Sequence, residues 1–245
     1  PFLSRKKAEF GVGIARMEDR YFQTNIIDFS ETKHDKSTYS IFGGSIVLEG
    51  STLNARQFAT QGSREKMAAQ IFTGTEHFRS GASKVTKDTP EPYKKVQSWL
   101  QVSYQNETYH KVSPKFTLGA YLEAYYSSRN FSNNYTATLM QAGEFTPTAH
   151  SKVTYNEAFR ANQYAGVGAM PIYQLSESFQ LRGEFYGFVP IFPIKKDEYG
   201  QAYYGKAFTK FEYLGEISLV FQLSFGSISC LLYTSPSPRD YAASR

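Results

Sequence analysis

The sequence lacks several features that define common protein classes. Its 245 residues include a single cysteine, Cys230, which excludes an intrachain disulfide framework and a zinc site built from several cysteines. No apolar run approaches the roughly 18 residues that a membrane-spanning helix needs, and the mean hydropathy is −0.45. The chain begins at Pro1 without an export signal, as if in the middle of a domain, so an exported parent protein would have to be longer than this segment.

Motifs that carry chemistry are also scarce. No Gly-x-Ser-x-Gly nucleophile elbow occurs, and the four histidines stand alone, without the spacing of metal ligands. The formal net charge of +5 is compatible with nucleic-acid binding, but Lys and Arg are scattered and form no stripe interleaved with aromatic residues. We therefore expect no catalytic activity in this segment, no metal or other cofactor, and no nucleic-acid partner.

Aromatic residues, by contrast, make up 16% of the chain, and they lie in stretches where apolar and polar residues alternate. In the clearest stretch, from Phe116 to Tyr126, every second residue is apolar and the residues between include Thr117 and Glu123. Only a β-strand places alternate residues on opposite faces. About ten residues at about 3.3 Å each, tilted by about 40°, cover about 25 Å, which is the height of the apolar band of an outer-membrane barrel.

Repetition of this pattern decides between a soluble and a membrane fold, because a soluble barrel or sandwich also alternates, with its apolar face inside. Connections between the predicted strands run long, medium, long, short, long, short, long, short, and transmembrane barrels have long external loops and tight periplasmic turns. We therefore predict an all-β fold, an antiparallel meander of about eight or nine transmembrane strands. The strands are predicted at 7–19, 38–49, 63–77, 99–110, 116–126, 163–174, 179–189 and 210–225, with the start of a ninth after Ser227.

The apolar face of these strands is predicted to contact lipid. Residues in mid-strand on the uncharged face form the predicted set: Leu118, Leu122, Leu181, Phe185, Ile217, Leu219 and Phe221. Gln180 and Ser218 lie on the opposite face, where an added charge is expected to cost less.

Two stretches resemble the bacterial surface antigen superfamily of outer-membrane assembly and translocation barrels. LNARQFATQGSREK, from Leu53 to Lys66, resembles its turn-and-strand signature, with Ala59 in place of the usual proline and Thr60, Gly62 and Arg64 as expected. YNEAFRANQYAGVG, from Tyr155 to Gly168, resembles the loop that bears its Arg-Gly-aromatic motif, although Arg160-Ala161-Asn162 stands in that place here.

Further stretches of the sequence, including YFQTNIIDF and FYGFVP, are similar to the barrel portion of Bacteroidetes-type patatin-like outer-membrane proteins. This resemblance implies a barrel of sixteen strands in the bacterial outer membrane, of which residues 1–229 would supply about strands seven to fifteen. It implies a membrane anchor that also serves as a conduit or insertase for a polypeptide, with a fused periplasmic patatin-like phospholipase domain on its amino-terminal side. Two alternatives are a phospholipase that the barrel only tethers, and a plain diffusion porin or transport channel.

The same resemblance suggests a role for Arg160. In the superfamily, the arginine loop folds into the lumen and the guanidinium meets a carboxylate on a wall strand. Here that implies a pair with Glu184, or with Glu216 as second choice. The alternative is that Arg160 caps an external loop in water.

The end of the chain is predicted not to belong to the barrel. CLLYTSPSPRD, from Cys230 to Asp240, resembles the translation of a sequencing adapter. We therefore predict that residues 230–245 are a non-native tail, irregular and weakly packed. Because roughly half the barrel would be missing, the remaining sheet is expected to be curved and open, with unpaired edges.

Overall fold

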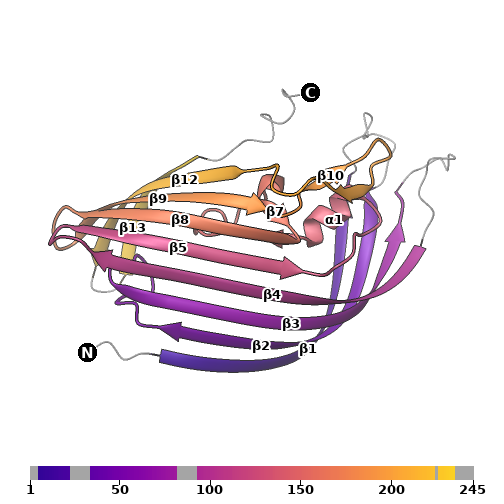
Figure 1. Ribbon diagram of the computed structural model, residues 1–245, viewed down its shortest axis with the longest axis horizontal. Coiled ribbons are helices and arrows are strands. Elements are labelled where there is room, and N and C mark those ends of the chain that lie inside the picture. Colours follow the sequence, from indigo (N-terminus) through magenta and orange to yellow (C-terminus); the bar gives the residue numbers. More distant parts are fainter. Residues whose placement is uncertain (1–4, 23–33, 82–92, 224–225, 235–245) are drawn as a thin grey trace.

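The computed structural model covers the chain and describes residues 5–22, 34–81, 93–223 and 226–234. Nine strands form one antiparallel sheet in which spatial neighbours follow each other in sequence order (Figure 1). They are β1 (Arg5–Tyr21), β2 (Asp35–Ser51), β3 (Gly62–Arg79), β4 (Tyr93–Lys111), β5 (Phe116–Ser127), β8 (Gln163–Gln174), β9 (Phe179–Pro190), β12 (Glu212–Leu223) and β13 (Gly226–Thr234). The predicted all-β antiparallel meander is confirmed.

The strand boundaries differ from the prediction mainly in β1–β4. These strands have 17 to 19 residues, and β4 begins at Tyr93 rather than at Trp99. The extension carries charged residues such as Lys94 and Lys95, which apolar alternation does not mark as strand. Pairing with β3 nevertheless continues to this end, because His77 and Phe78 offer backbone partners there.

The connections sort by length between the two ends of the sheet, as predicted. At one end, called here the long-loop end, they span 22–34, 80–92, 128–162 and 191–211. At the other end, the short-turn end, they span 52–61, 112–115, 175–178 and 224–225.

Alternation gives the sheet two different faces. The face that carries Leu122 and Phe185 is exposed and is called the outer face, whereas the face that carries Glu123 and Tyr186 is largely buried and is called the inner face. The buried residues of the main core lie on the inner face together with residues of the connection 128–162.

The connection 128–162, called here the inner segment, contains secondary structure of its own. It holds α1 (Tyr135–Gln141), β6 (Gly143–Glu144), the 3-10 turn Glu157–Phe159 and β7 (Arg160–Ala161). Asn134 caps α1, since its side chain accepts a hydrogen bond of 2.8 Å from the backbone N–H of Ala137. No helix in the described part of the chain is long and apolar enough to cross a bilayer.

The sheet curves around the inner segment (Figure 1). Gln141 Nε2 donates to Asp19 Oδ2 of β1 over 2.7 Å, and the His150 ring lies 4.3 Å from the ring of Tyr233 in β13. These two contacts join the inner segment to both edge strands of the sheet. The connection 191–211 adds the small hairpin β10 (Ile194–Lys196) and β11 (Ala202–Tyr204) beside α1 at the long-loop end.

The sheet is open in the described residues, because no strand pairing joins β1 to β13. An open, curved sheet is what we predict for an isolated barrel segment, while membership of a sixteen-stranded barrel stays a prediction. The prediction that residues 230–245 are irregular is wrong for part of this range. Cys230–Thr234 continues β13 and pairs with β12, because the free edge of β12 offers unpaired backbone groups to a β-prone segment. Residues 235–245 lie outside the described residues.

Candidate functional site

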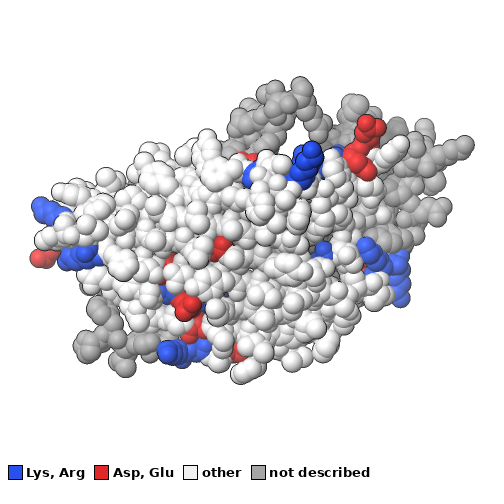
Figure 2. All heavy atoms as spheres, viewed as in Figure 1, with Lys and Arg blue, Asp and Glu red and all other residues white. Residues whose placement is uncertain are grey.

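The outer face carries an apolar band across the strands of the sheet. All seven predicted lipid-facing residues lie on it, and Leu118, Leu122, Leu181, Phe185, Ile217 and Leu219 are between 42% and 50% exposed. Phe221 is partly covered because its ring packs 4.6 Å from that of Phe179. Figure 2 shows a surface over the strands that is mostly without charge.

This apolar exposure extends beyond the seven predicted residues, mainly onto β1–β4. Further exposed residues of the outer face are Phe10, Val12, Ile14, Phe42, Ile46, Leu48, Met67, Ile71, Val96, Leu100, Val102, Val167 and Tyr213. Soluble monomers rarely expose a continuous apolar patch larger than a few hundred Å². The outer face is therefore a candidate surface for contact with an apolar medium.

The inner face carries an aromatic core centred on Phe145 of the inner segment. Its ring lies 5.5 Å from Phe188, 6.0 Å from Tyr164 and 6.3 Å from Tyr186. A Cβ atom on Gly166 would come within 2.2 Å of the Phe145 ring, so the absence of a side chain at this wall position makes room for it. The inner segment is thus packed against the inner face of the sheet.

A buried carboxylate joins the same core to the segment. Glu123 of β5 is 4% exposed, and it accepts hydrogen bonds from the hydroxyls of Tyr121 and Tyr164, the latter over 2.7 Å. The Tyr164 hydroxyl also lies 3.0 Å from the carbonyl oxygen of Glu144 in β6. Glu123 therefore binds two tyrosines of the inner face, one of which contacts the inner segment.

Arg182 forms the most connected buried group of the wall. It is 3% exposed and donates from Nε to Glu184 Oε1 over 2.5 Å. Its other nitrogens donate to the Tyr109 hydroxyl over 2.6 Å and to the carbonyl oxygen of Ala59 over 2.9 Å. Arg182 thereby links β9, β4 and the turn 52–61, which folds beneath the inner face at the short-turn end.

A second buried arginine lies at the other end of the inner face. The guanidinium of Arg129 lies 4.6 Å from the ring of Trp99 and 5.2 Å from that of Tyr39, and its Nη1 donates to Gln141 over 2.8 Å. Burial lowers the pKa of Arg129 from its ordinary value. Arg129 fastens α1 to the inner face of β2 and β4 through stacking and a hydrogen bond.

The predicted pairing of Arg160 with Glu184 or Glu216 is wrong. Arg160 Nη2 lies 2.8 Å from Glu144 Oε2, which stands directly opposite it in the β6–β7 pair. Its Nη1 donates to the carbonyl oxygens of Leu139 and Met140 over 3.3 and 3.1 Å. It therefore caps the end of α1 and holds the inner segment together, rather than tying it to the wall.

The two predicted wall carboxylates have other environments. Glu184 is occupied by Arg182, two residues earlier on the same face of β9, and by the Tyr186 hydroxyl at 3.0 Å. Glu216 lies directly opposite Glu184 across the β9–β12 pair and is 6% exposed. Arg182, rather than Arg160, pairs with Glu184 because it lies on the same strand and needs no loop to reach the carboxylate.

The residues of the turn signature stabilise the turn 52–61. Asn54 Oδ1 accepts from the backbone N–H of Thr60 over 3.0 Å, and its Nδ2 donates to the Thr60 hydroxyl. Gly62 has φ +91°, where a Cβ would also meet the Thr52 carbonyl oxygen at 2.2 Å. Arg64 pairs with Glu49 over 2.8 Å on the neighbouring strand.

Part of the inner face is covered by other segments of the chain. Gln180 and Ser218 are 0% and 2% exposed, so both lie under a cover, and the expectation that a charge costs less at these residues than on the outer face stays a prediction. The inner segment and the turn 52–61 cover this region from opposite ends of the sheet. The sequence analysis did not identify Arg129, Arg182 and Phe145 as functional residues. The one sequence signal for them is that the polar faces of the strands are rich in glycine, which leaves room for bulky or charged side chains beside them.

No cluster of three or more His, Cys, Asp or Glu side chains suited to a metal ion occurs within the described ranges. Comparisons of the chain with protein-family models, with curated proteins and with solved structures found no match. The functional argument therefore rests on the two faces of the sheet.

Proposed function

We propose that this chain is a wall segment of a bacterial outer-membrane β-barrel and that it anchors its protein in the lipid bilayer. The observation that carries the proposal is the outer face, which exposes apolar side chains in the middle of each strand of the nine-stranded sheet from β1 to β12, while most polar residues in the middle of these strands turn to the inner face. In water this face would aggregate, whereas in a bilayer it is the face that barrels present to lipid.

The covered inner face favours an anchor or a gated conduit over an open diffusion pore. The inner segment is held to the wall by an aromatic core and by Arg129, and the turn 52–61 is held by Arg182. In the proposed conduit or insertase, a polypeptide passes only when the inner segment moves. The patatin-like domain that the resemblance implies belongs to the same proposal, and an upstream reading frame with a Gly-x-Ser-x-Gly motif would test it.

A charge placed in the outer face tests the anchor. Leu122 lies in the middle of β5 and is 44% exposed, and an arginine at mid-bilayer costs about 2–4 kcal/mol. Val153 of the inner segment is 82% exposed and lies outside the strands, so Val153→Arg adds the same charge in water. Flotation of the refolded chain with phosphatidylcholine vesicles should fall for Leu122→Arg and stay at the wild-type level for Val153→Arg.

Equal flotation of the two variants would contradict the assignment of the outer face to lipid. A wild-type chain that stays in the soluble fraction without vesicles and does not float with them would contradict the membrane proposal itself.

A further inference from the structure

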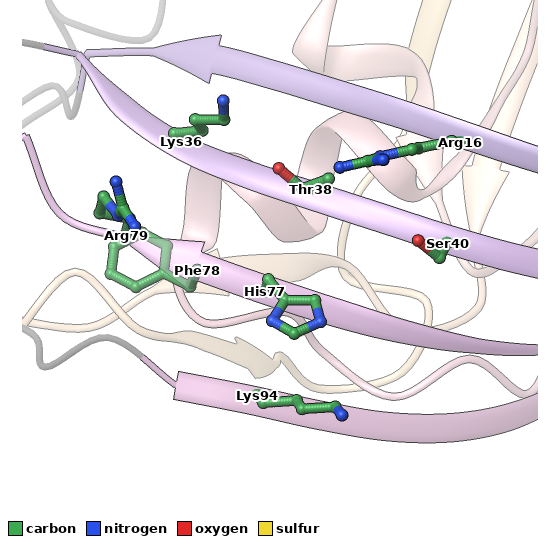
Figure 3. Close-up of a pocket in the computed structure, with 8 residues that line it drawn as sticks. All are labelled: Arg16, Lys36, Thr38, Ser40, His77, Phe78, Arg79 and Lys94. Atoms are coloured by element: carbon green, nitrogen blue, oxygen red, sulfur yellow. The ribbon is translucent and has the colours of Figure 1, made fainter.

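Basic side chains gather on the outer face of β1–β4 at the long-loop end. They line a surface hollow and come from four neighbouring strands: Arg16 of β1, Lys36 of β2, His77 and Arg79 of β3, and Lys94 of β4 (Figure 3). These five residues are called here the basic cluster. Scattered along the sequence, they form no motif, and only the strand register brings them together.

The register places like charges directly opposite each other. Lys36 stands between Arg20 of β1 and Arg79 of β3, and in the next row His77 stands opposite Lys94. Like charges in directly opposed positions destabilise an antiparallel sheet. A bound anion would therefore stabilise this row of three cations by reducing the repulsion between them.

The carboxylates of the described chain neutralise only one side of this row. Glu18 lies 2.7 Å from Arg20 and 2.6 Å from Lys36. Arg16, Arg79 and Lys94 have no ion pair with any carboxylate of the described residues. The side of the cluster formed by β3 and β4 is thus the more positive one.

The position of the cluster along the strands indicates what kind of anion fits. Ile14 precedes Arg16 by two residues on the same face, and Val96 follows Lys94 by two, a separation of about 7 Å along a strand. Phe42, Ile71 and Leu100 continue the apolar surface below them. The cluster therefore lies where the apolar band ends, which is the depth of a lipid headgroup if the band lies in a bilayer.

The other end of the same strands has no such cluster. There the outer-face row consists of Lys6, Gly50, Glu65 and Asn106, with one cation and one anion. In the described parts of β1–β4, clustering of outer-face cations thus occurs only on the long-loop side of the apolar band. The basic cluster therefore lies at one edge of the apolar band only.

We infer that the basic cluster binds the phosphate group of an acylated, phosphorylated lipid in the leaflet at the long-loop end. Arg79 and Arg16 supply planar guanidinium groups that fork onto phosphate oxygens, Lys36 and Lys94 supply point charges, and the acyl chains lie on the apolar outer face. Thr38 and Ser40 add hydroxyl donors between the cations. This inference rests on the proposed membrane function, because a soluble anion would make no use of the adjoining apolar band.

The test compares a phosphorylated glycolipid with its dephosphorylated form. The full chain in maltoside micelles is titrated calorimetrically with an acylated disaccharide that carries two phosphates. Arg79→Gln combined with Lys94→Gln should weaken binding about tenfold or more, since each hydrogen bond to a charged group contributes enough for roughly that factor. Lys6→Gln combined with Lys115→Gln removes the same charge at the short-turn end and should leave binding within about twofold of wild type.

Three results would overturn the inference: equal affinity for the dephosphorylated lipid, an effect of the control variant as large as that of Arg79→Gln with Lys94→Gln, or displacement of the lipid by millimolar inorganic phosphate. The last result would make the cluster a site for free anions. Flotation with uncharged phosphatidylcholine vesicles separates the two proposals. If wild type and the double variant both float, but wild type binds the phosphorylated and the dephosphorylated lipid equally well, only the lipid site is refuted. If wild type does not float, the membrane function fails.

Discussion

Replacing Arg182 by methionine tests how the wall holds the turn 52–61. Methionine keeps much of the side-chain volume and removes the guanidinium, so three hydrogen bonds are lost and Glu184 keeps only the Tyr186 hydroxyl. Three bonds to a charged donor amount to about 5–9 kcal/mol in gross terms. The methionine variant does not have to desolvate a guanidinium on folding, which offsets several kcal/mol, so we expect a loss of about 3–5 kcal/mol in the free energy of unfolding.

Two measurements check this expectation. Urea unfolding in micelles can be followed by the fluorescence of Trp99, the single tryptophan. Because Arg182 holds the carbonyl of Ala59, trypsin should also cut faster after the exposed Arg56 in the same turn. The control Arg64→Gln removes a partly exposed ion pair with Glu49 and should cost less than about 1 kcal/mol.

A double change separates the lost partner from the lost volume. Adding Glu184→Gln to Arg182→Met removes the carboxylate that the first change leaves buried and poorly paired, so the double variant should be more stable than Arg182→Met alone. If Arg182→Met unfolded within about 0.5 kcal/mol of wild type and left cleavage after Arg56 unchanged, the link from β9 to the turn would be refuted.

Two further predictions concern the inner segment. Arg160→Gln removes the partner of Glu144 and of the last carbonyls of α1, so proteolysis within residues 128–162 should accelerate. Glu144→Gln should accelerate proteolysis in the same way, and the double variant should add little to either single change. Additive effects of the two changes would contradict the ion pair. Gly166→Ala drives a methyl group into Phe145 and should cost about 1–3 kcal/mol in urea unfolding, whereas Gly13→Ala, with no atom within 4 Å of its added Cβ, should have little effect; equal costs would contradict the packing.

The outer face was predictable because its cause is local. Alternation fixes which side of a strand a residue occupies, and one correct strand assignment places Leu122 and Phe185 without any knowledge of the rest of the fold. The sorting of the loops by length follows from the same assignment. The extra length of β1–β4 was missed because charged residues such as Lys94 continue the pairing without continuing the apolar pattern.

The inner face was less predictable because its contacts depend on the path of a long connection. The resemblance to the surface antigen superfamily led to a wall partner for Arg160, but Glu144 is brought opposite it by two residues of strand pairing inside the same segment. Glu184, in turn, meets an arginine two residues away on its own strand face, a spacing visible in the sequence. Near neighbours were therefore better candidates than distant ones.

The strand β13 shows that pairing and membrane character are separate properties. The run Cys230-Leu231-Leu232-Tyr233 pairs with residues 216–219 of β12, within a register that extends from Gly215 to Leu223. Cys230 and Leu232 face outward beside Leu219 and Ile217, but Leu231 and Tyr233 turn equally apolar side chains to the inner face, where the other strands place polar or tightly packed residues. A free edge accepts any β-prone segment because backbone groups do the pairing. Alternation, which β12 has and this run lacks, is therefore the criterion that distinguishes a wall strand from a segment that only fills the edge.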